Sequence, residues 1–301
     1  MSALTKPDKS ASYYYKCLNA FVLAGFQEIW RRLPGISMVR GLNITGLKMI
    51  ELYLWRVLLV AIAASALLIS ACGLSESAKK QGTYHYEMGV SYFKENNMTA
   101  ALTELTEAEK YFDDKADLYN YLGMAYYIKK KYEIAEQKYL KALLLNPTYS
   151  EARNSLGVNY LEMRRWDDAI YQFKLVTDDI FYPNQVAANI NLGLAYFGKG
   201  DYPKSLSQLR SVVANYPRDP RGRLNLGRVY FAMDKTDLAI DEYKKALELN
   251  REYVNAYYHL GLAYLKKKES RAAMSAFQEA LRLAPDSEVG QISKEYLNAL
   301  K

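Results

Sequence analysis

Residues 116–149 read ADLYNYLGMAYYIKKKYEIAEQKYLKALLLNPTY, and this stretch decides the fold. Two segments with apolar side chains at helical spacing flank a lysine-rich turn at residues 129–131. Asn146-Pro147 ends the second segment, because proline lacks a backbone N–H and disfavours helical geometry in the residue before it. The stretch therefore predicts a helical hairpin. One hairpin cannot bury its two-sided apolar surface alone, so copies of it are expected elsewhere in the chain.

Copies of the Leu-Gly-x-x-Tyr core of this hairpin recur along the chain. The intervals between the repeated glycines are 34, 34, 36, 34 and 34 residues, for Gly89, Gly123, Gly157, Gly193, Gly227 and Gly261. Twelve residues after each glycine stands an alanine or serine, and an aromatic residue or leucine follows four residues later. A glycine within a helix costs about 1 kcal/mol relative to alanine. We expect that cost to be offset because a neighbouring helix can approach closely, with the small residue as the partner surface. The tyrosine three positions after each glycine and the aromatic residue or leucine of the second helix are expected to fill the space between the helices.

The period and these positions resemble the tetratricopeptide repeat. The resemblance implies an all-α, right-handed superhelical solenoid of six repeats, whose core runs along the stack. The predicted repeats are residues 82–115, 116–149, 150–183, 186–219, 220–253 and 254–287. Residues 288–301 carry apolar residues at helical spacing and are predicted to form a capping helix over the last hairpin.

The composition argues against nucleic-acid binding and against catalysis. The formal net charge is +7, but residues 1–71 hold eight Lys/Arg against three Asp/Glu, so most of the basic excess lies outside the repeats. The two histidines, His85 and His259, belong to different repeats, and no catalytic triad, metal-ligand cluster or phosphate-binding loop is found in the sequence. We therefore expect no enzyme activity, no metal, no cofactor and no small-molecule substrate.

Residues 57–69 form a run of 13 apolar or small residues, which fits the hydrophobic region of a signal peptide better than a membrane span. The run ends in Leu-Ile-Ser-Ala-Cys at residues 68–72, which resembles the lipobox of bacterial lipoproteins. That resemblance implies a signal peptide at residues 49–71, a lipid on the sulfur of Cys72, and a polar tether at residues 72–81. Gly73 follows the cysteine, and resemblance to enterobacterial sorting rules, in which Asp is the retention signal, implies delivery to the periplasmic face of the outer membrane. An uncleaved anchor from about Leu52 to Leu74 is the alternative.

Residues 1–48 carry no repeat signature. A signal peptide of 71 residues would be unusually long, so we interpret residues 1–48 as a non-functional extension or as the result of a start site placed upstream of the real one. Translation from Met38 or Met49 would give leaders of ordinary length.

The single 36-residue interval falls at a junction that contains Asp178, Asp179, Tyr182 and Pro183. Six repeats, a lipoprotein signal and this junction together resemble the type IV pilus pilotin family. The resemblance implies a lipid-anchored scaffold that assists outer-membrane localisation and assembly of the pilus secretin. The alternatives are a periplasmic adaptor that recruits envelope or cell-wall enzymes, and a plain membrane-anchored scaffold.

The ninth and twelfth positions of each repeat are the predicted partner-binding residues, because in such solenoids the first helices line the concave face. These positions are almost all apolar: Val90, Phe93, Met124, Tyr127, Val158, Leu161, Leu194, Phe197, Arg228, Phe231, Leu262 and Leu265. An apolar groove of this kind fits an extended or helical apolar segment of a protein partner. For any one of these residues, packing between adjacent first helices is an equally good interpretation.

Overall fold

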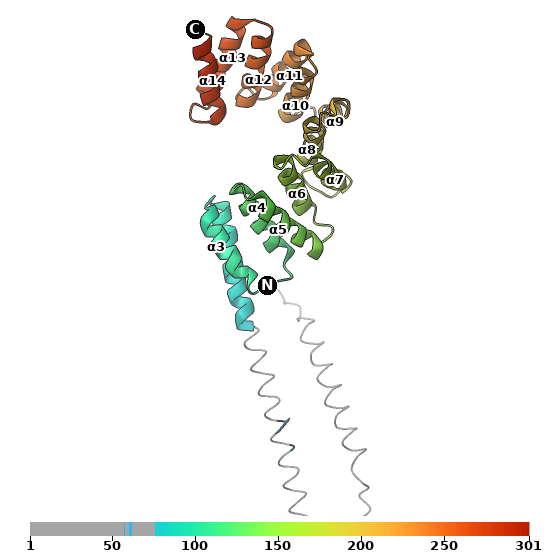
Figure 1. The fold of residues 1–301 in the computed structure, drawn as a ribbon, viewed down its shortest axis with the longest axis vertical. Helices are drawn as coiled ribbons and strands as arrows, with labels where there is room; N and C mark the ends of the chain where they lie inside the picture. The colour runs from blue at the N-terminus through green and yellow to red at the C-terminus, as the bar shows by residue number, and fades with distance from the viewer. Residues whose placement is uncertain (1–56, 58–59, 62–75, 301) are drawn as a thin grey trace, which may run out of the picture. The chain divides into compact units, whose positions relative to one another are not determined.

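The structure is a computed structural model that describes residues 57, 60, 61 and 76–300 (Figure 1). The chain divides into two units, residues 1–75 and residues 76–301, and the repeats belong to the second. Cys72, residues 1–48 and nearly all of the predicted signal peptide lie outside the described residues. Within the described ranges, no helix combines the length and the apolar character needed to span a membrane.

The second unit consists of consecutive helix pairs. Residues 76–94 form its first helix, which includes residues 76–81 of the expected tether. The helices that follow are α3 (Met98–Glu109), α4 (Ala116–Ile128), α5 (Tyr132–Leu145), α6 (Ser150–Glu162), α7 (Trp166–Thr177), α8 (Gln185–Gly198), α9 (Tyr202–Asn215), α10 (Pro220–Ala232), α11 (Thr236–Leu249), α12 (Val254–Lys266), α13 (Ser270–Leu283) and α14 (Glu288–Ala299). Helices and turns account for all of residues 76–300, so the predicted all-α solenoid is confirmed.

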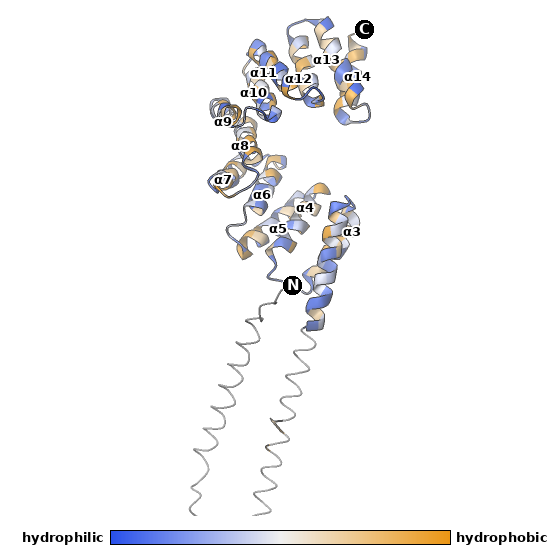
Figure 2. Ribbon diagram, turned by 180° about the vertical axis from the view of Figure 1, so that it is seen from behind, coloured by the Kyte–Doolittle hydropathy of each residue, from blue (hydrophilic) through white to orange (hydrophobic). Residues whose placement is uncertain are grey.

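Apolar residues occur along every helix pair instead of in one central core (Figure 2). Five separate clusters of buried side chains follow one another from the first repeat to the last. The core therefore runs along the stack, as expected for a chain whose repeats pack mainly on their neighbours.

The repeated glycines let the two helices of each pair approach closely. A Cβ built on Gly123 would lie 2.5 Å from Cε1 of Tyr139, and one on Gly157 would lie 2.6 Å from Cε1 of Phe173. The side chain sixteen residues after the glycine therefore fills the space between the helices, as the sequence predicted, and the small residue twelve positions after the glycine was the predicted partner surface. That residue does also contact the glycine, since Ser205 Oγ donates to the carbonyl oxygen of Gly193 at 2.8 Å.

The turn within each helix pair has a left-handed residue at the fifteenth position of the repeat. Positive φ angles occur at Asn96, Lys130, Arg164, Gly200, Asp234 and Lys268, with values between 56° and 81°. Lysine and arginine rarely adopt this conformation, because their Cβ crowds the neighbouring carbonyl oxygen. The hairpin geometry therefore imposes strain at three basic residues, which their sequence did not indicate.

Polar contacts join consecutive repeats at equivalent positions. The lysine at the fourteenth position reaches the eighteenth position of the preceding repeat in three places: Lys129 Nζ to Thr99 Oγ1 at 2.9 Å, Lys199 Nζ to Asp167 Oδ1 at 2.5 Å, and Lys267 Nζ to Asp237 Oδ1 at 2.8 Å. All of these groups are largely exposed, so each contact contributes little to stability by itself. They recur between the first and second, the third and fourth, and the fifth and sixth repeats.

Helix α14 covers the last hairpin, as predicted. It packs on α13 and α12. The ring of its Tyr296 stacks on Phe277 with the centroids 4.8 Å apart, and Leu297 is buried in the same cluster. The capping helix therefore shields apolar surface that the final repeat would otherwise expose.

Candidate functional site

The predicted partner-binding residues lie on the first helices of consecutive repeats, and these helices contact one another. Helix α4 contacts α6, α6 contacts α8, α8 contacts α10, and α10 contacts α12. Residues at one repeat position therefore recur from helix to helix along the stack. We call the twelve predicted residues at the ninth and twelfth positions the first-helix row.

Every residue of the first-helix row is half-buried. None of the twelve is buried like the core residues, and none is exposed like a residue of a solvated surface. Val158 and Leu161 pack against the buried cluster around Phe173, and Phe197 and Phe231 pack against the cluster around Tyr243. The side chains thus touch the core on one side and remain accessible on the other, so their burial fits both of the interpretations made from the sequence.

Aromatic side chains line parts of the row. The ring of Phe93 meets that of Tyr121 edge-on at 5.5 Å, and Phe197 lies 5.6 Å from Tyr202. Tyr127 packs against Tyr132 with a centroid separation of 5.7 Å. Such pairs combine a large apolar area with few rotatable bonds, so they lose little conformational entropy on binding a partner.

Within the first-helix row, Tyr127 contacts the carboxylate of Glu162. Its hydroxyl donates to Oε1 of Glu162 at 3.4 Å. Burial of the phenol, followed by the charge of Glu162, raises the pKa of Tyr127 to about 12. The hydroxyl therefore stays protonated at physiological pH and acts as a hydrogen-bond donor.

Arg228 is the one charged residue of the row. Its Nη1 donates to Oδ1 of Asn225 at 2.9 Å, and its guanidinium lies 5.5 Å from the ring centroid of Phe197. Burial lowers the pKa of Arg228, although the group stays charged at neutral pH. Within residues 76–300 it makes no ion pair with a carboxylate. The C-terminal half of the row thus carries a largely desolvated positive charge.

His259 lies close to this charge. Its ring stacks on Tyr243 at 5.7 Å and meets Tyr258 edge-on at 5.3 Å. Burial, followed by the charge of Arg228, lowers the pKa of His259 to about 4. The imidazole is therefore neutral at pH 7. Its aromatic surroundings make it a packing residue.

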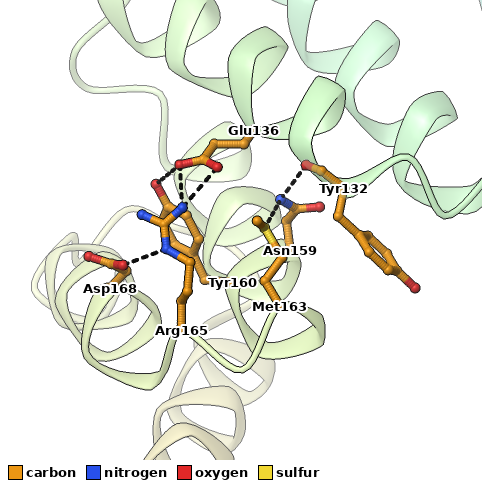
Figure 3. A network of polar contacts seen from close by, with 7 residues as sticks. All are labelled: Tyr132, Glu136, Asn159, Tyr160, Met163, Arg165 and Asp168. Carbon is orange, nitrogen blue, oxygen red and sulfur yellow. Dashed lines mark hydrogen bonds and ion pairs between the residues drawn. The ribbon is translucent and has the colours of Figure 1, made fainter.

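A polar network joins the second and third repeats (Figure 3). The guanidinium of Arg165 donates to Oε1 and Oε2 of Glu136 at 2.8 and 2.9 Å and to Oδ2 of Asp168 at 2.8 Å. The hydroxyl of Tyr160 donates a hydrogen bond to Oε1 of Glu136 at 2.9 Å. Nearby, Asn159 Nδ2 donates to the backbone oxygen of Tyr132 at 2.9 Å. This network could not be predicted from the sequence, because its members are up to 36 residues apart and belong to four different segments.

The junction residues predicted from the sequence do lie together. Helix α7 ends at Thr177, Asp178 caps it, and Tyr182 is buried beside Val176 and Ala188. Asp179 holds the turn, since its Oδ1 accepts from the backbone N–H of Phe181 at 3.0 Å and its Oδ2 accepts from Ser150 Oγ at 2.5 Å. Ser150 belongs to the start of α6, so the junction is tied to the repeat that precedes it.

Models of the tetratricopeptide repeat match this chain at residues 116–149, 154–220, 227–268 and 254–287. Together with the stack of helical hairpins, these matches define the class of protein. The chain is a tetratricopeptide-repeat protein. The tetratricopeptide-repeat fold generally serves as a non-catalytic scaffold for protein–protein interaction.

Among the proteins it resembles are factors of type IV pilus biogenesis. It is 25% identical over 110 residues to the type IV pilus assembly protein PilF of Pseudomonas aeruginosa, which is 36% of this chain and 44% of PilF. It is 23% identical over 171 residues to human tetratricopeptide repeat protein 6, which is 55% of this chain and 31% of that protein. The chain thus spans less than half the length of these relatives.

A solved structure shows the same arrangement of repeats. The crystal structure of PilW, described as a widely conserved type IV pilus biogenesis factor, superposes with a TM-score of 0.62. The superposition covers 70% of this chain and 97% of PilW, at 18% sequence identity. At that identity the likeness concerns the fold alone.

Proposed function

We propose that this chain is a lipid-anchored, non-enzymatic scaffold that assists outer-membrane localisation and assembly of a type IV pilus secretin. The observation that carries the proposal is a stack of six repeats with an accessible apolar row along its first helices, in a chain distantly similar to PilF. The lipobox-like ending at Cys72 supports attachment to the periplasmic face of the outer membrane. Two or three acyl chains at that cysteine would hold the protein on the membrane, since one chain binds only reversibly.

In this proposal the first-helix row receives an apolar segment of the secretin subunit. Val158 and Leu194 stand at the ninth position of the two repeats that flank the junction. Their half-buried side chains would be covered by the segment, and each covered aliphatic side chain contributes up to about 1.5–3 kcal/mol. The positive charge of Arg228 would favour a partner segment with an acidic residue near one end, because opposite charges fix register more than affinity.

The cellular test is deletion of the chain, followed by detection of secretin multimers in the outer membrane. The proposal expects multimers to be lost or retained in the inner membrane, and pili to disappear. Unchanged multimers and normal pili would reject it. Accumulation of cell-wall defects in their place would favour the adaptor that recruits envelope enzymes.

The test of the row is the double substitution Val158→Glu and Leu194→Glu. Two carboxylates in the row should weaken secretin capture by at least about tenfold, because a charge cannot be buried against an apolar segment without a partner. Leu144→Glu is the matched control, since Leu144 is 73% exposed on a second helix. Helical circular dichroism should be the same for all variants. Loss of helicity in the double variant would mean that these side chains belong to the core.

A further inference from the structure

The turn between α7 and α8 exposes two neighbouring large apolar side chains. Ile180 is 80% exposed and Phe181 is 87% exposed, which are the highest values for large apolar residues in the described part of the chain. An isolated exposed leucine on a helix needs no explanation, whereas an adjacent pair projecting from a turn is a feature of interaction sites. Neither residue belongs to the first-helix row.

The backbone that carries this pair is held in place from several directions. The carbonyl oxygen of Asp179 accepts from the backbone N–H of Tyr182 at 3.0 Å and from Nε2 of Gln185 at 2.5 Å. The side chain of Asp179 accepts from Phe181 and from Ser150, and Tyr182 is buried just beyond the pair. Ile180 and Phe181 are thus presented by a fixed turn, so little backbone entropy would be lost when a partner covers them.

The other turns that join two repeats show that such a turn does not need apolar residues at its tip. The corresponding exposed pairs are Asp113-Asp114, Pro147-Thr148, Pro217-Arg218 and Arg251-Glu252, and the turn between the last repeat and α14 presents Pro285-Asp286. All of them consist of proline and polar residues, which is the ordinary composition of surface turns. The two-residue insertion at the 36-residue interval therefore adds an apolar pair where the architecture tolerates polar residues.

The charges around the pair indicate what could cover it. Asp178, which immediately precedes the turn, is exposed and makes no ion pair within residues 76–300. Asp179 accepts its hydrogen bonds from neutral groups, so its charge is not cancelled either. A membrane surface with anionic lipids would repel these two carboxylates. A protein surface that combines an apolar pocket with basic side chains at its rim would complement both features.

We propose that Ile180 and Phe181 form a docking knob that inserts into an apolar pocket, bordered by Lys or Arg side chains, on a protein partner. The knob is a second interaction surface, separate from the first-helix row. Its aromatic side chain supplies the buried anchor of the contact, and Asp178 supplies the charge that orients it.

Photocrosslinking in the cells that make the full-length chain tests this proposal. The photoreactive residue p-benzoylphenylalanine replaces Phe181 in one variant, Arg218 of the matched turn in a second, and Val158 of the first-helix row in a third. The first variant should be joined to one protein that the Arg218 variant does not capture. The crosslinked peptide of that protein should lie in an apolar pocket with Lys or Arg beside it.

Affinity for the captured protein provides the second measurement. Phe181→Ser should raise the Kd at least about tenfold, because a large buried apolar side chain is lost, and Asp178→Lys should raise it several-fold. Leu238→Ser, at a residue 45% exposed on α11, should change it less than twofold. All three positions are exposed, so the variants should melt at the temperature of the wild type.

Several results would overturn the proposal that Ile180 and Phe181 form a docking knob. They are crosslinks to lipid or to a second copy of this chain, no adduct beyond the Arg218 control, or an unchanged Kd for Phe181→Ser. Capture through Val158 without capture through Phe181 would reject the knob and leave the proposed function intact. Capture through Phe181 alone would support the knob and argue against the first-helix row.

Discussion

Lowering the pH should destabilise the fifth and sixth repeats through His259. This imidazole stacks on Tyr243 and lies near the guanidinium of Arg228, and burial followed by that positive charge lowers its pKa to about 4. In the unfolded chain the pKa of a histidine is close to 6.5. The unfolded state therefore binds a proton at a pH where the folded state does not.

The sign and the size of the effect follow from that difference. Stability from neutral His259 is fully present above about pH 6.5 and is lost as the pH falls from there towards 4, below which both states are protonated. Between pH 7 and pH 4.5 the loss is about 2–3 kcal/mol, because each tenfold difference in proton affinity is about 1.4 kcal/mol. Asp219, whose pKa is lowered by hydrogen bonds from Arg221, adds a loss at still lower pH.

Two measurements on the whole chain check this prediction. The chain has only two histidines, so the ring C–H resonances of His259 can be assigned by comparison with a His85→Gln variant and followed as the pH is lowered. Urea unfolding at pH 7 and pH 4.5, compared between wild type and His259→Gln, gives the stability difference. Arg228→Met should raise the pKa of His259, because it removes the nearby positive charge. A pKa above 6 for His259, or an equal pH dependence in the Gln variant, would refute the reasoning.

Three further predictions concern single positions. Gly157→Ala should destabilise the chain by about 1–3 kcal/mol in urea unfolding, because the new Cβ would meet the fully buried ring of Phe173 at 2.6 Å, and a stabilised variant would contradict the packing described above. Lys268→Gly should raise the urea midpoint by the equivalent of up to about 1 kcal/mol, because φ at this position is 62° and glycine removes the strain; an unchanged or lower midpoint would argue against strain there. Cys72→Ser should abolish fatty-acid labelling while Cys17→Ser leaves it unchanged, and label retained on the Cys72 variant would exclude lipid attachment at that sulfur.

The fold could be predicted from the sequence because its decisive residues are repeated. Gly123 and Tyr139 alone would be a weak signal, but the same pair of positions recurs in every repeat and lies in contact each time. The glycine spacing thus fixed the number of helix pairs. The residue sixteen positions after the glycine was predicted to fill the space between the two helices, and it contacts the glycine in every repeat.

The turns and the charge network could not be predicted in the same way. Lys130 and Arg164 adopt positive φ angles, a conformation for which glycine or asparagine is the usual residue. The residue types at these positions therefore do not indicate the conformation. Asp168 lies in the first turn of α7 and pairs with Arg165. That pair connects to Glu136, 29 residues earlier, through a contact that exists only once the repeats have stacked.

The junction shows a different limit of sequence interpretation. Asp179 and Tyr182 belong to the junction that the 36-residue interval marks, and in the structure Asp179 holds the turn while Tyr182 is buried beside Val176. The exposure of Ile180 and Phe181 could not be predicted, because apolar residues in a sequence ordinarily indicate burial. In the structure, Asp179 holds the backbone of the turn through its hydrogen bonds, and Ile180 and Phe181 are exposed to solvent.

The contacts between helices have a consequence for how the chain acquires its structure. Among helices α3–α14, each one touches only the next helix or the next but one, so native contacts join residues that are close in sequence. Chains of this kind close short loops and fold quickly. Each hairpin can dock on the one before it while the remainder of the polypeptide is still being synthesised. We then expect the last hairpin formed to expose its apolar packing face until the next hairpin docks on it. Helix α14 finally covers the packing face of the sixth repeat.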